Sequence, residues 1–175
     1  MIFAQALAFT LTLAAAPAGT EVVLDGLKSI APAAWKEIPA SGMRMKQFQV
    51  PKAQGDQFDA EIVVFFFGPG GGGGVQANVD RWKKMFQAPE GKKADEGKID
   101  TATIGKVKAT ILDIRGTYLW KAAPMAPESE PRANHRMLAV VFESPNGPYF
   151  IRLVGPDKTV AQHKKDFDRW LRSFK

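Results

Sequence analysis

A run of five glycines between an apolar strand pattern and a helical pattern constrains this chain more than any other feature. Residues 62–67 (IVVFFF) are apolar on both alternating faces, which is typical of a strand buried on both sides. Gly68, Pro69 and the glycines follow, and residues 75–86 then repeat apolar side chains at helical spacing. We therefore expect residues 60–67 to form a central strand, with helices or a second layer on each face.

The other segments alternate strand patterns with turn compositions. We expect strands over residues 35–38, 43–50, 99–104, 107–120, 136–143 and 149–154, helices over residues 75–86 and 157–175, and a mobile loop over residues 121–134. Gly105 and Lys106 suit a two-residue turn, Gly116 indicates a bulge, and Asp157 or Thr159 is the expected N-cap of the last helix. Because hairpins dominate, we predict an α+β fold, an antiparallel β-sheet covered by two amphipathic helices.

Length and composition favour a single domain. A chain of 175 residues that is 45% hydrophobic can bury one core without disulfides, and it contains no cysteine. Residues 1–18 are uncharged and end in a small-residue series, so we predict a signal peptide cleaved after Ala18 and an exported, periplasmic or extracellular protein. The usual positive start is missing, because no Lys or Arg precedes Lys28. Residues 19–31 then form a lead-in segment and residues 32–175 the domain, and we expect no transmembrane segment in the mature chain.

Three sequence features occur together with this order of elements: Pro32-x-x-Trp35 before the first strand, Gly155-Pro156 before the last helix, and the ending Phe167-x-x-Trp170-Leu171-x-Ser173-Phe174. In these features the chain resembles the PsbP-like fold family. The family is named for an extrinsic photosystem subunit, and over residues 32–175 the chain is similar to its uncharacterised bacterial secreted members. The resemblance implies a sheet covered by helices and a non-enzymatic binding or assembly role. It carries over no active-site residue and no cofactor.

The glycine run is the first candidate site. Its members are Gly70, Gly71, Gly72, Gly73 and Gly74. Gly68, Gly70 and Gly73 spell G-x-G-x-x-G, but a hairpin pattern follows the helix where a dinucleotide fold needs a parallel strand. We interpret the run as a flexible connector. The alternative is an anion or partner contact through free backbone N–H groups at the start of a helix.

A second candidate site lies at the end of the long strand. Tyr118, Trp120 and Met125 are the aromatic and apolar residues most free to form a patch for a protein or ligand partner. The alternative is that Trp120 only covers the edge of the sheet.

The histidines do not form a persuasive catalytic or metal site. His135 follows the expected mobile loop, where Glu128 and Glu130 are not held well enough for acid–base catalysis. His163 lies beside the apolar stripe of the last helix, so we expect it to be packed, and with Asp166 it offers only two metal ligands. We therefore predict no catalytic residue, no metal site and no cofactor.

Two acids keep an enzyme interpretation open. Asp113 and Glu143 lie within apolar strands, where burial would raise a carboxyl pKa as a hydrolase requires. Pairing with Arg115 or Arg152 is the alternative explanation. The serines lack the surroundings of known nucleophile motifs.

The net charge of +6 points to an anionic partner. The basic residues nevertheless come as doublets at 83–84, 92–93 and 164–165, interleaved with acids, which is typical of a solvated face and disfavours nucleic acid. We expect an exported, non-enzymatic binding or assembly module whose partner is an unknown protein or an anionic ligand. A small-anion or polyanion binder and a hydrolase are the alternatives.

Overall fold

The computed structural model describes residues 19–122 and 126–175. The predicted signal peptide and Met125 therefore lie outside the described residues. Among the described residues, no helix combines the length and the apolar character that crossing a membrane requires.

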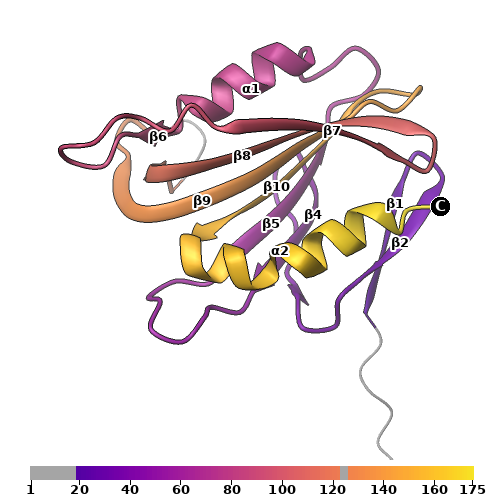
Figure 1. The fold of residues 1–175 in the computed structure, drawn as a ribbon. Coiled ribbons are helices and arrows are strands. Elements are labelled where there is room, and N and C mark those ends of the chain that lie inside the picture. The colour runs from indigo at the N-terminus through magenta and orange to yellow at the C-terminus, as the bar shows by residue number, and fades with distance from the viewer. Residues whose placement is uncertain (1–18, 123–125) are drawn as a thin grey trace, which may run out of the picture.

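Ten strands and two helices make up the described fold (Figure 1). In chain order they are β1 (Thr20–Leu24), β2 (Leu27–Ala31), β3 (Lys36–Glu37), β4 (Arg44–Val50), β5 (Ala60–Phe66), α1 (Val75–Lys83), β6 (Phe86–Gln87), β7 (Lys98–Ile104), β8 (Val107–Trp120), β9 (Glu130–Phe142), β10 (Tyr149–Pro156) and α2 (Asp157–Arg172). The main sheet has the order β3-β4-β5-β10-β9-β8-β6, and β7 also pairs with β8. Every pairing is antiparallel, which confirms the predicted α+β class with an antiparallel sheet.

The strand that precedes the glycine run lies inside the sheet, as its apolar faces predict. β5 pairs with β4 on one side and with β10 on the other. Its side chains alternate between two cores, so that Ile62 and Val64 contribute to one core and Phe65 packs against the other. The two apolar faces of the sequence run therefore correspond to two packed faces of the sheet.

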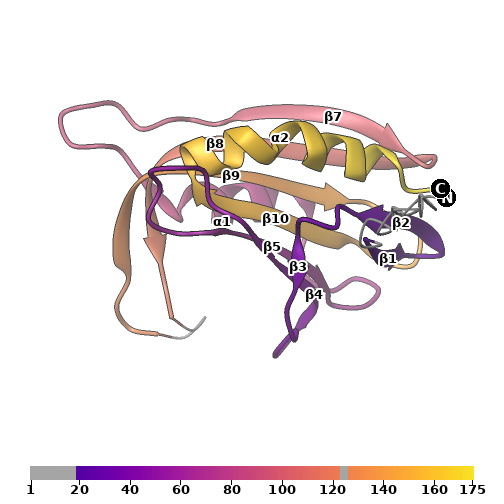
Figure 2. The ribbon, with the colours of Figure 1, turned by 90° about the horizontal axis from the view of Figure 1, so that it is seen from below.

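Helix α2 packs on one face of the sheet (Figure 2). Phe167, Trp170 and Leu171 share a core with Leu138 of β9 and Ile151 of β10. These helical residues recur on one stripe because their spacing follows the 3.6-residue period.

The predicted N-cap of α2 is wrong. The helix begins at Asp157 after Pro156, and no side chain of that segment caps it. Instead Asp56, from the loop between β4 and β5, accepts hydrogen bonds at Oδ2 from Thr159 N at 3.0 Å and Thr159 Oγ1 at 2.5 Å. A residue 103 positions away in the chain therefore satisfies the helix end.

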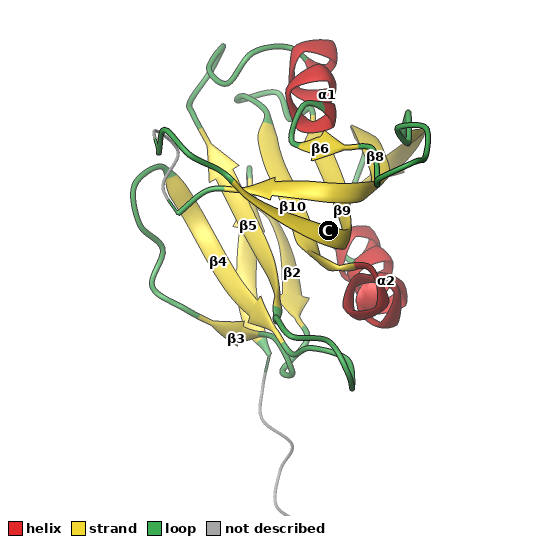
Figure 3. Cartoon of the chain, turned by 90° about the vertical axis from the view of Figure 1, so that its left-hand side faces the viewer, coloured by secondary structure: helices red, strands yellow, loops and turns green. Residues whose placement is uncertain are grey.

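Helix α1 packs on the opposite face, where Trp82 shares a core with Met137 and Phe150. The two helices therefore belong to separate cores, and Figure 3 shows them apart from each other on the sheet. Sequence periodicity extends this helix to residue 86, but it ends at Lys83 and Phe86 belongs to β6. The chain leaves the helix because Phe86 pairs with Tyr118 of β8. As a result, α1 covers only part of its face.

The segment expected to be a lead-in is a β-hairpin with its own pairing, β1 with β2. Val22 and Leu24 are fully buried in the core under α2. The hairpin also meets the C-terminus, since Lys28 N donates to Lys175 O at 2.9 Å and Lys175 N donates back to Lys28 O at 3.2 Å (Figure 2). Both ends of the described chain therefore contribute to one core.

The long hairpin of β8 and β9 reaches further than the sequence indicated. β9 begins at Glu130, which pairs with Trp120, so residues 130–134 are strand and the predicted loop is shorter. The predicted bulge is confirmed, because the register shifts between Gly116 and Tyr118. The turn at Gly105 and Lys106 is confirmed as well, since both residues have positive φ, 51° and 72°.

Candidate functional site

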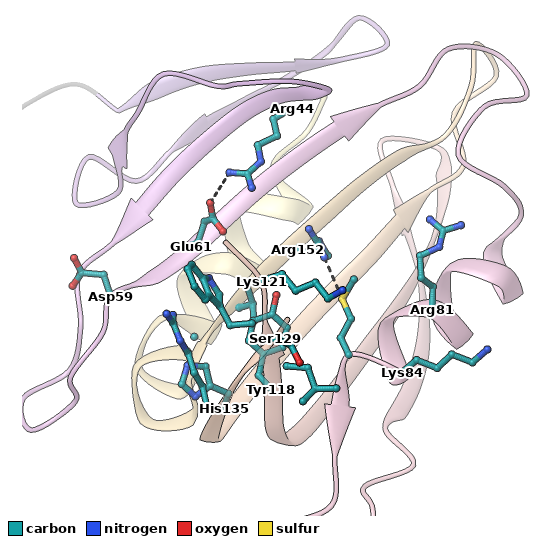
Figure 4. Close-up of a pocket in the computed structure, with 16 residues that line it drawn as sticks. Arg44, Asp59, Glu61, Arg81, Lys84, Tyr118, Lys121, Ser129, His135 and Arg152 are labelled. Carbon is teal, nitrogen blue, oxygen red and sulfur yellow. Dashed lines mark hydrogen bonds and ion pairs between the residues drawn. The ribbon is translucent and has the colours of Figure 1, made fainter. Parts of the chain in front are cut away.

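A cavity of about 530 Å³ lies on the face that α1 leaves partly uncovered (Figure 4). It is lined by Arg44, Asp59, Glu61, Arg81, Lys84, Met85, Tyr118, Leu119, Trp120, Lys121, Ser129, Arg132, His135, Arg152, Val154 and Gly155. Six of these side chains are basic and two are acidic. The lining comes from β4, β5, α1, β8, β9 and β10, so the sheet itself builds most of the site.

Arg152 is the most unusual group of the cavity. It lies on β10 between Ile151 and Leu153, which are both fully buried in the α2 core, so its own side chain lies on the α1 side. Its Nη1 donates to Met85 Sδ at 3.4 Å, and its guanidinium carbon lies 5.1 Å from the centre of the Phe65 ring. Both contacts are weak substitutes for water or a carboxylate.

Within the part of the chain that the structure describes, Arg152 forms no ion pair. The residues outside that part contain no Asp or Glu. Burial lowers the pKa of Arg152 below its ordinary value, although the nearby Tyr118 and Glu61 oppose this effect. Arg152 is therefore a partly desolvated cation without an anion.

The neighbouring acid is already neutralised. Glu61 Oε1 accepts a hydrogen bond from Arg44 Nη1 at 3.0 Å and another from Gln47 Nε2. These three side chains come from adjacent strands, β4 and β5, which fix their arrangement. Glu61 therefore compensates Arg44 and leaves the charge of Arg152 in excess.

Two further cations reach the cavity from α1. Arg81 Nη1 donates to Asn78 Oδ1 at 3.2 Å. Lys84 immediately follows the helix as its C-cap residue. Among the described residues neither cation forms an ion pair. Their position near the helix C-terminus is favourable in itself, because the helix dipole is negative there.

Aromatic side chains form another wall of the cavity. The Tyr118 ring stacks on His135 with 6.1 Å between ring centres, and burial raises the Tyr118 pKa. Arg132 lies between two rings, 4.0 Å from the centre of Trp120 and 4.4 Å from that of Phe58. This stack connects the β8–β9 hairpin to the loop between β4 and β5.

His135, which was expected directly after a mobile loop, lies within a strand in the wall of the cavity. It belongs to β9, is 5% exposed, and its Nδ1 lies 2.9 Å from Ala133 O. Burial lowers its pKa, and the charge of Arg132 acts in the same direction. The neutral form of His135 is therefore favoured in the folded protein.

The structure brings together only part of the predicted sites. Tyr118 and Trp120 both line the cavity, whereas Met125 lies outside the described residues. The predicted glycines Gly70, Gly71, Gly72, Gly73 and Gly74 do not line it.

The Asn78 side chain forms hydrogen bonds with backbone carbonyl groups of the glycine run. It is 2% exposed, and its Nδ2 donates to the carbonyl oxygens of Gly72, Gly73 and Gly74 at 2.9, 3.3 and 2.9 Å. Acceptors therefore converge in front of α1, whereas an anion contact needs donors.

Sequence reasoning missed the basic floor of the cavity. Arg152 was noted only as a pairing partner, yet it is the single charge in the apolar run of residues 149–154 (YFIRLV). A lone charge in a strand with buried neighbours is the signal that could have identified it. Arg81 carried no such signal, because its role depends on where α1 ends.

The acids proposed for a hydrolase lie outside the cavity. Burial alone would raise the pKa of Asp113, but hydrogen bonds from Arg136 at 2.6 and 2.8 Å and its charge hold that pKa below the ordinary value. Glu143 lies 3.3 Å from Lys108 Nζ. Neither carboxylate is arranged as a general acid.

The second histidine is packed, as predicted. His163 is buried, accepts a hydrogen bond at Nδ1 from Trp35 Nε1 at 3.4 Å, and bonds through Nε2 to Pro51 O at 2.9 Å. Across residues 19–122 and 126–175, no three His, Cys, Asp or Glu side chains cluster closely enough to hold a metal ion.

No family model and no curated protein sequence matches this chain. Its structure is similar to the solution structure of cyanobacterial PsbP from Synechocystis sp. PCC 6803, with a TM-score of 0.55 and 12% identity over 95% of this chain and 97% of that one. A protein of unknown function from Pseudomonas aeruginosa aligns with a TM-score of 0.47 and 16% identity over 89% of this chain and 94% of that one. The resemblance predicted from the sequence is thus confirmed for the fold: the chain has a PsbP-like fold.

Proposed function

We propose that this chain is a non-enzymatic binding module that takes an anionic ligand, or an anionic group of a partner, in the Arg152 cavity. The observation that carries the proposal is the partly desolvated guanidinium of Arg152, which forms no ion pair among the described residues. Holding a charge in this way destabilises a folded protein unless an anion compensates it. A binding site is the natural reason to retain such a group.

Another cavity among the described residues provides a contrast, and we refer to it as the second cavity. It lies between the β1–β2 hairpin and α2, and it too has basic residues. There, however, Lys28 pairs with Glu21 at 3.6 Å and Arg169 pairs with Asp166 at 3.3 Å. Its other two cations, Arg172 and Lys175, form no ion pair among the described residues, but both are exposed to water. Arg152 is half-buried and has less access to water, so we assign the anion to the Arg152 cavity.

A polyanion binder receives less support. That function needs the lysine doublets to converge on one face. Lys84 reaches the cavity beside α1, whereas Lys164 and Lys165 lie on α2, on the opposite face of the sheet. The dispersed doublets favour a single compact anionic group as the ligand. We infer that the two helices cover the sheet unequally, and that this leaves room for the ligand. Helix α2 covers one face, whereas α1 leaves the cavity open on the other face.

Binding measurements with two matched variants test the proposal. Isothermal titration of the purified protein with sulfate, phosphate, nucleotides and small carboxylates should find at least one anion that binds. Arg152→Met keeps a long apolar side chain and removes the charge, so it should weaken that binding at least about tenfold. Arg169→Met, which removes a cation of the second cavity, should bind like the wild type. Equal binding by all three proteins, or no binding by the wild type, would contradict the proposal.

The stability of Arg152→Met without ligand separates a binding role from a structural one. A desolvated cation that serves ligand binding destabilises the ligand-free protein. Replacement of Arg152 should therefore leave the melting temperature unchanged or raise it. A clear fall in melting temperature would indicate that Arg152 instead stabilises the fold.

We propose export as well, because residues 1–18 have the pattern of a signal peptide. N-terminal sequencing of the protein recovered from its native cells should give a start at Gly19. A start at Met1 would contradict this proposal.

A further inference from the structure

We infer that the ligand of the cavity is an apolar carboxylate, one carboxylate group carried on an apolar or aromatic body. This inference rests on the proposed function and adds the chemical class of the anion. It is drawn from the number of available charges, the kind of donors, and the character of the walls.

One uncompensated guanidinium lies at the floor of the cavity. Phe65 lies against the guanidinium of Arg152 and Met85 Sδ accepts from Nη1, which leaves its remaining N–H groups for a ligand. An arginine that offers paired N–H donors matches the two oxygens of a carboxylate. Figure 4 shows Lys84 extending away from Arg152, and Arg81 standing apart from it on α1. Lys121, the other lining cation that forms no ion pair among the described residues, donates through Nζ to Ala126 O at 2.9 Å. A single negative charge is therefore sufficient to compensate Arg152.

Among the residues that the structure describes, the donors that phosphate sites commonly add do not line this cavity. Such sites use backbone N–H groups at a helix N-terminus or in a glycine loop. Helix α1 instead contributes residues near its C-terminus, Arg81 and Lys84. At the start of α2, Asp56 already accepts from Thr159 N, and the glycine run does not line the cavity. A multiply charged oxyanion would thus find side-chain donors only.

Apolar and aromatic side chains line part of the cavity beside Arg152. Val154 follows Arg152 on the same face of β10 and is 8% exposed, and Met85, Leu119, Tyr118 and Trp120 continue the lining. The cavity volume of about 530 Å³ lies within the range that binds small organic molecules. A carboxylate on an apolar body would place its charge at Arg152 and its body on this surface.

Two sources supply this chemistry: a free apolar acid, and the C-terminal residue of a polypeptide that ends in an apolar side chain. Both present one carboxylate next to apolar atoms, so the same contacts would hold either. The test therefore contains probes for both.

The experiment is a titration of the purified protein with matched pairs of probes. The free acids are octanoate and 3-phenylpropionate, each paired with its neutral amide. The polypeptide probe is a tetrapeptide ending in Leu-Phe, with a free or an amidated C-terminus, and phenyl phosphate and inorganic phosphate represent the other anions. The carboxylates should bind at least tenfold more tightly than their amides, and Arg152→Met should abolish this preference while Arg169→Met keeps it. Tighter binding by the peptide assigns a polypeptide end, and tighter binding by a free acid assigns a small molecule.

Three results would overturn the inference. Phosphates that bind tenfold more tightly than every carboxylate, and lose this affinity in Arg152→Met, would leave the anion-binding function intact and reject the carboxylate. Amides that bind as tightly as acids would show that the charge is irrelevant and would reject both proposals. Absence of binding by all carboxylates, with the peptide included, would reject the inference even where sulfate or a nucleotide binds.

Discussion

Asn78 Oδ1 accepts a hydrogen bond from Arg81 Nη1 at 3.2 Å, one helical turn further along α1. The same Asn78 holds the carbonyl groups of Gly72, Gly73 and Gly74 through its Nδ2. One buried amide thus connects the glycine run to a cation that lines the cavity. The glycine run contributes to the site by positioning α1, without contacting the cavity itself.

Loss of this amide should destabilise the protein. Asn78→Ala removes the side-chain donor of the Gly72 and Gly73 carbonyl groups and releases Arg81, while Gly74 O keeps the backbone N–H of residue 78. We therefore expect the free energy of unfolding to fall by about 1–3 kcal/mol. Urea denaturation measures the change. Gln76→Ala is the control, because Gln76 makes only an exposed hydrogen bond to Asp80 at 2.8 Å. Equal effects of the two substitutions would contradict the role given to Asn78.

The glycines of the run should differ strongly in their tolerance of a side chain. Gly72 has φ of +76°, and an added Cβ would overlap the Phe150 ring, so Gly72→Ala should cost about 2 kcal/mol or more in the free energy of unfolding. Gly74 has φ of −72° and open space around it. It is the N-cap residue of α1, where alanine is less favourable than glycine, but alanine also lowers the entropy of the unfolded chain, so Gly74→Ala should change stability by less than about 0.5 kcal/mol. Thermal denaturation of both variants checks the order. A uniform response along the run would indicate a flexible connector.

This difference shows one limit of sequence reasoning. Five identical letters suggested one property, flexibility, whereas Gly72 packs against Phe150 and Gly74 faces open space. The packing partner of Gly72 comes from β10, which lies far along the chain, so no local pattern contains it.

Local periodicity predicted most elements because each buries one face. In β5 and α2 the spacing of the apolar residues along the sequence was enough to indicate which side chains are buried. The end of α1 was missed because pairing of Phe86 with Tyr118 overrides a helical pattern that continues to residue 86. The basic floor of the cavity was missed for the same reason, whereas Tyr118 and Trp120 of its wall were predicted as candidate site residues. Arg152 alone left a readable signal, a single charge in an apolar strand.

The capping of α2 by a distant residue should be measurable. Asp56→Ala removes the acceptor of Thr159 N and Oγ1, and we expect a loss of about 1 kcal/mol in the free energy of unfolding. Asp100→Ala, which removes a carboxylate from an exposed ion pair with Lys98, should have little effect. If Asp56→Ala were as stable as Asp100→Ala, the helix would not depend on this cap.

The ion pair between Asp113 and Arg136 should appear in the pH dependence of stability. Burial raises the Asp113 pKa, but the hydrogen bonds and the charge of Arg136 lower it by more. The pKa of Asp113 in the folded protein is therefore below the value of about 3.9 in an unfolded chain. The folded protein then binds fewer protons at this group, so its stabilisation is fully present above about pH 4 and disappears as pH falls through the folded pKa.

Chemical denaturation between pH 2 and 6 tests this contribution. Asp113→Asn should lose stability near neutral pH and show a weaker decline toward acid than the wild type. Asp166→Asn, which removes an exposed carboxylate from α2, is the control for a change of one charge. An acid decline in Asp113→Asn as steep as that of the wild type would refute the assignment.

The most direct measurement observes the guanidinium of Arg152 itself. Arginine side-chain Nε–Hε resonances of the ¹⁵N-labelled protein can be followed by NMR during titration with sulfate, phosphate and 3-phenylpropionate, and Arg152→Met and Arg169→Met identify the two signals. If Arg152 receives the anion, its resonance should shift and saturate with at least one probe while that of Arg169 stays in place. A saturable shift of Arg169 with Arg152 unmoved, or no saturable shift of Arg152 with any probe, would contradict the account.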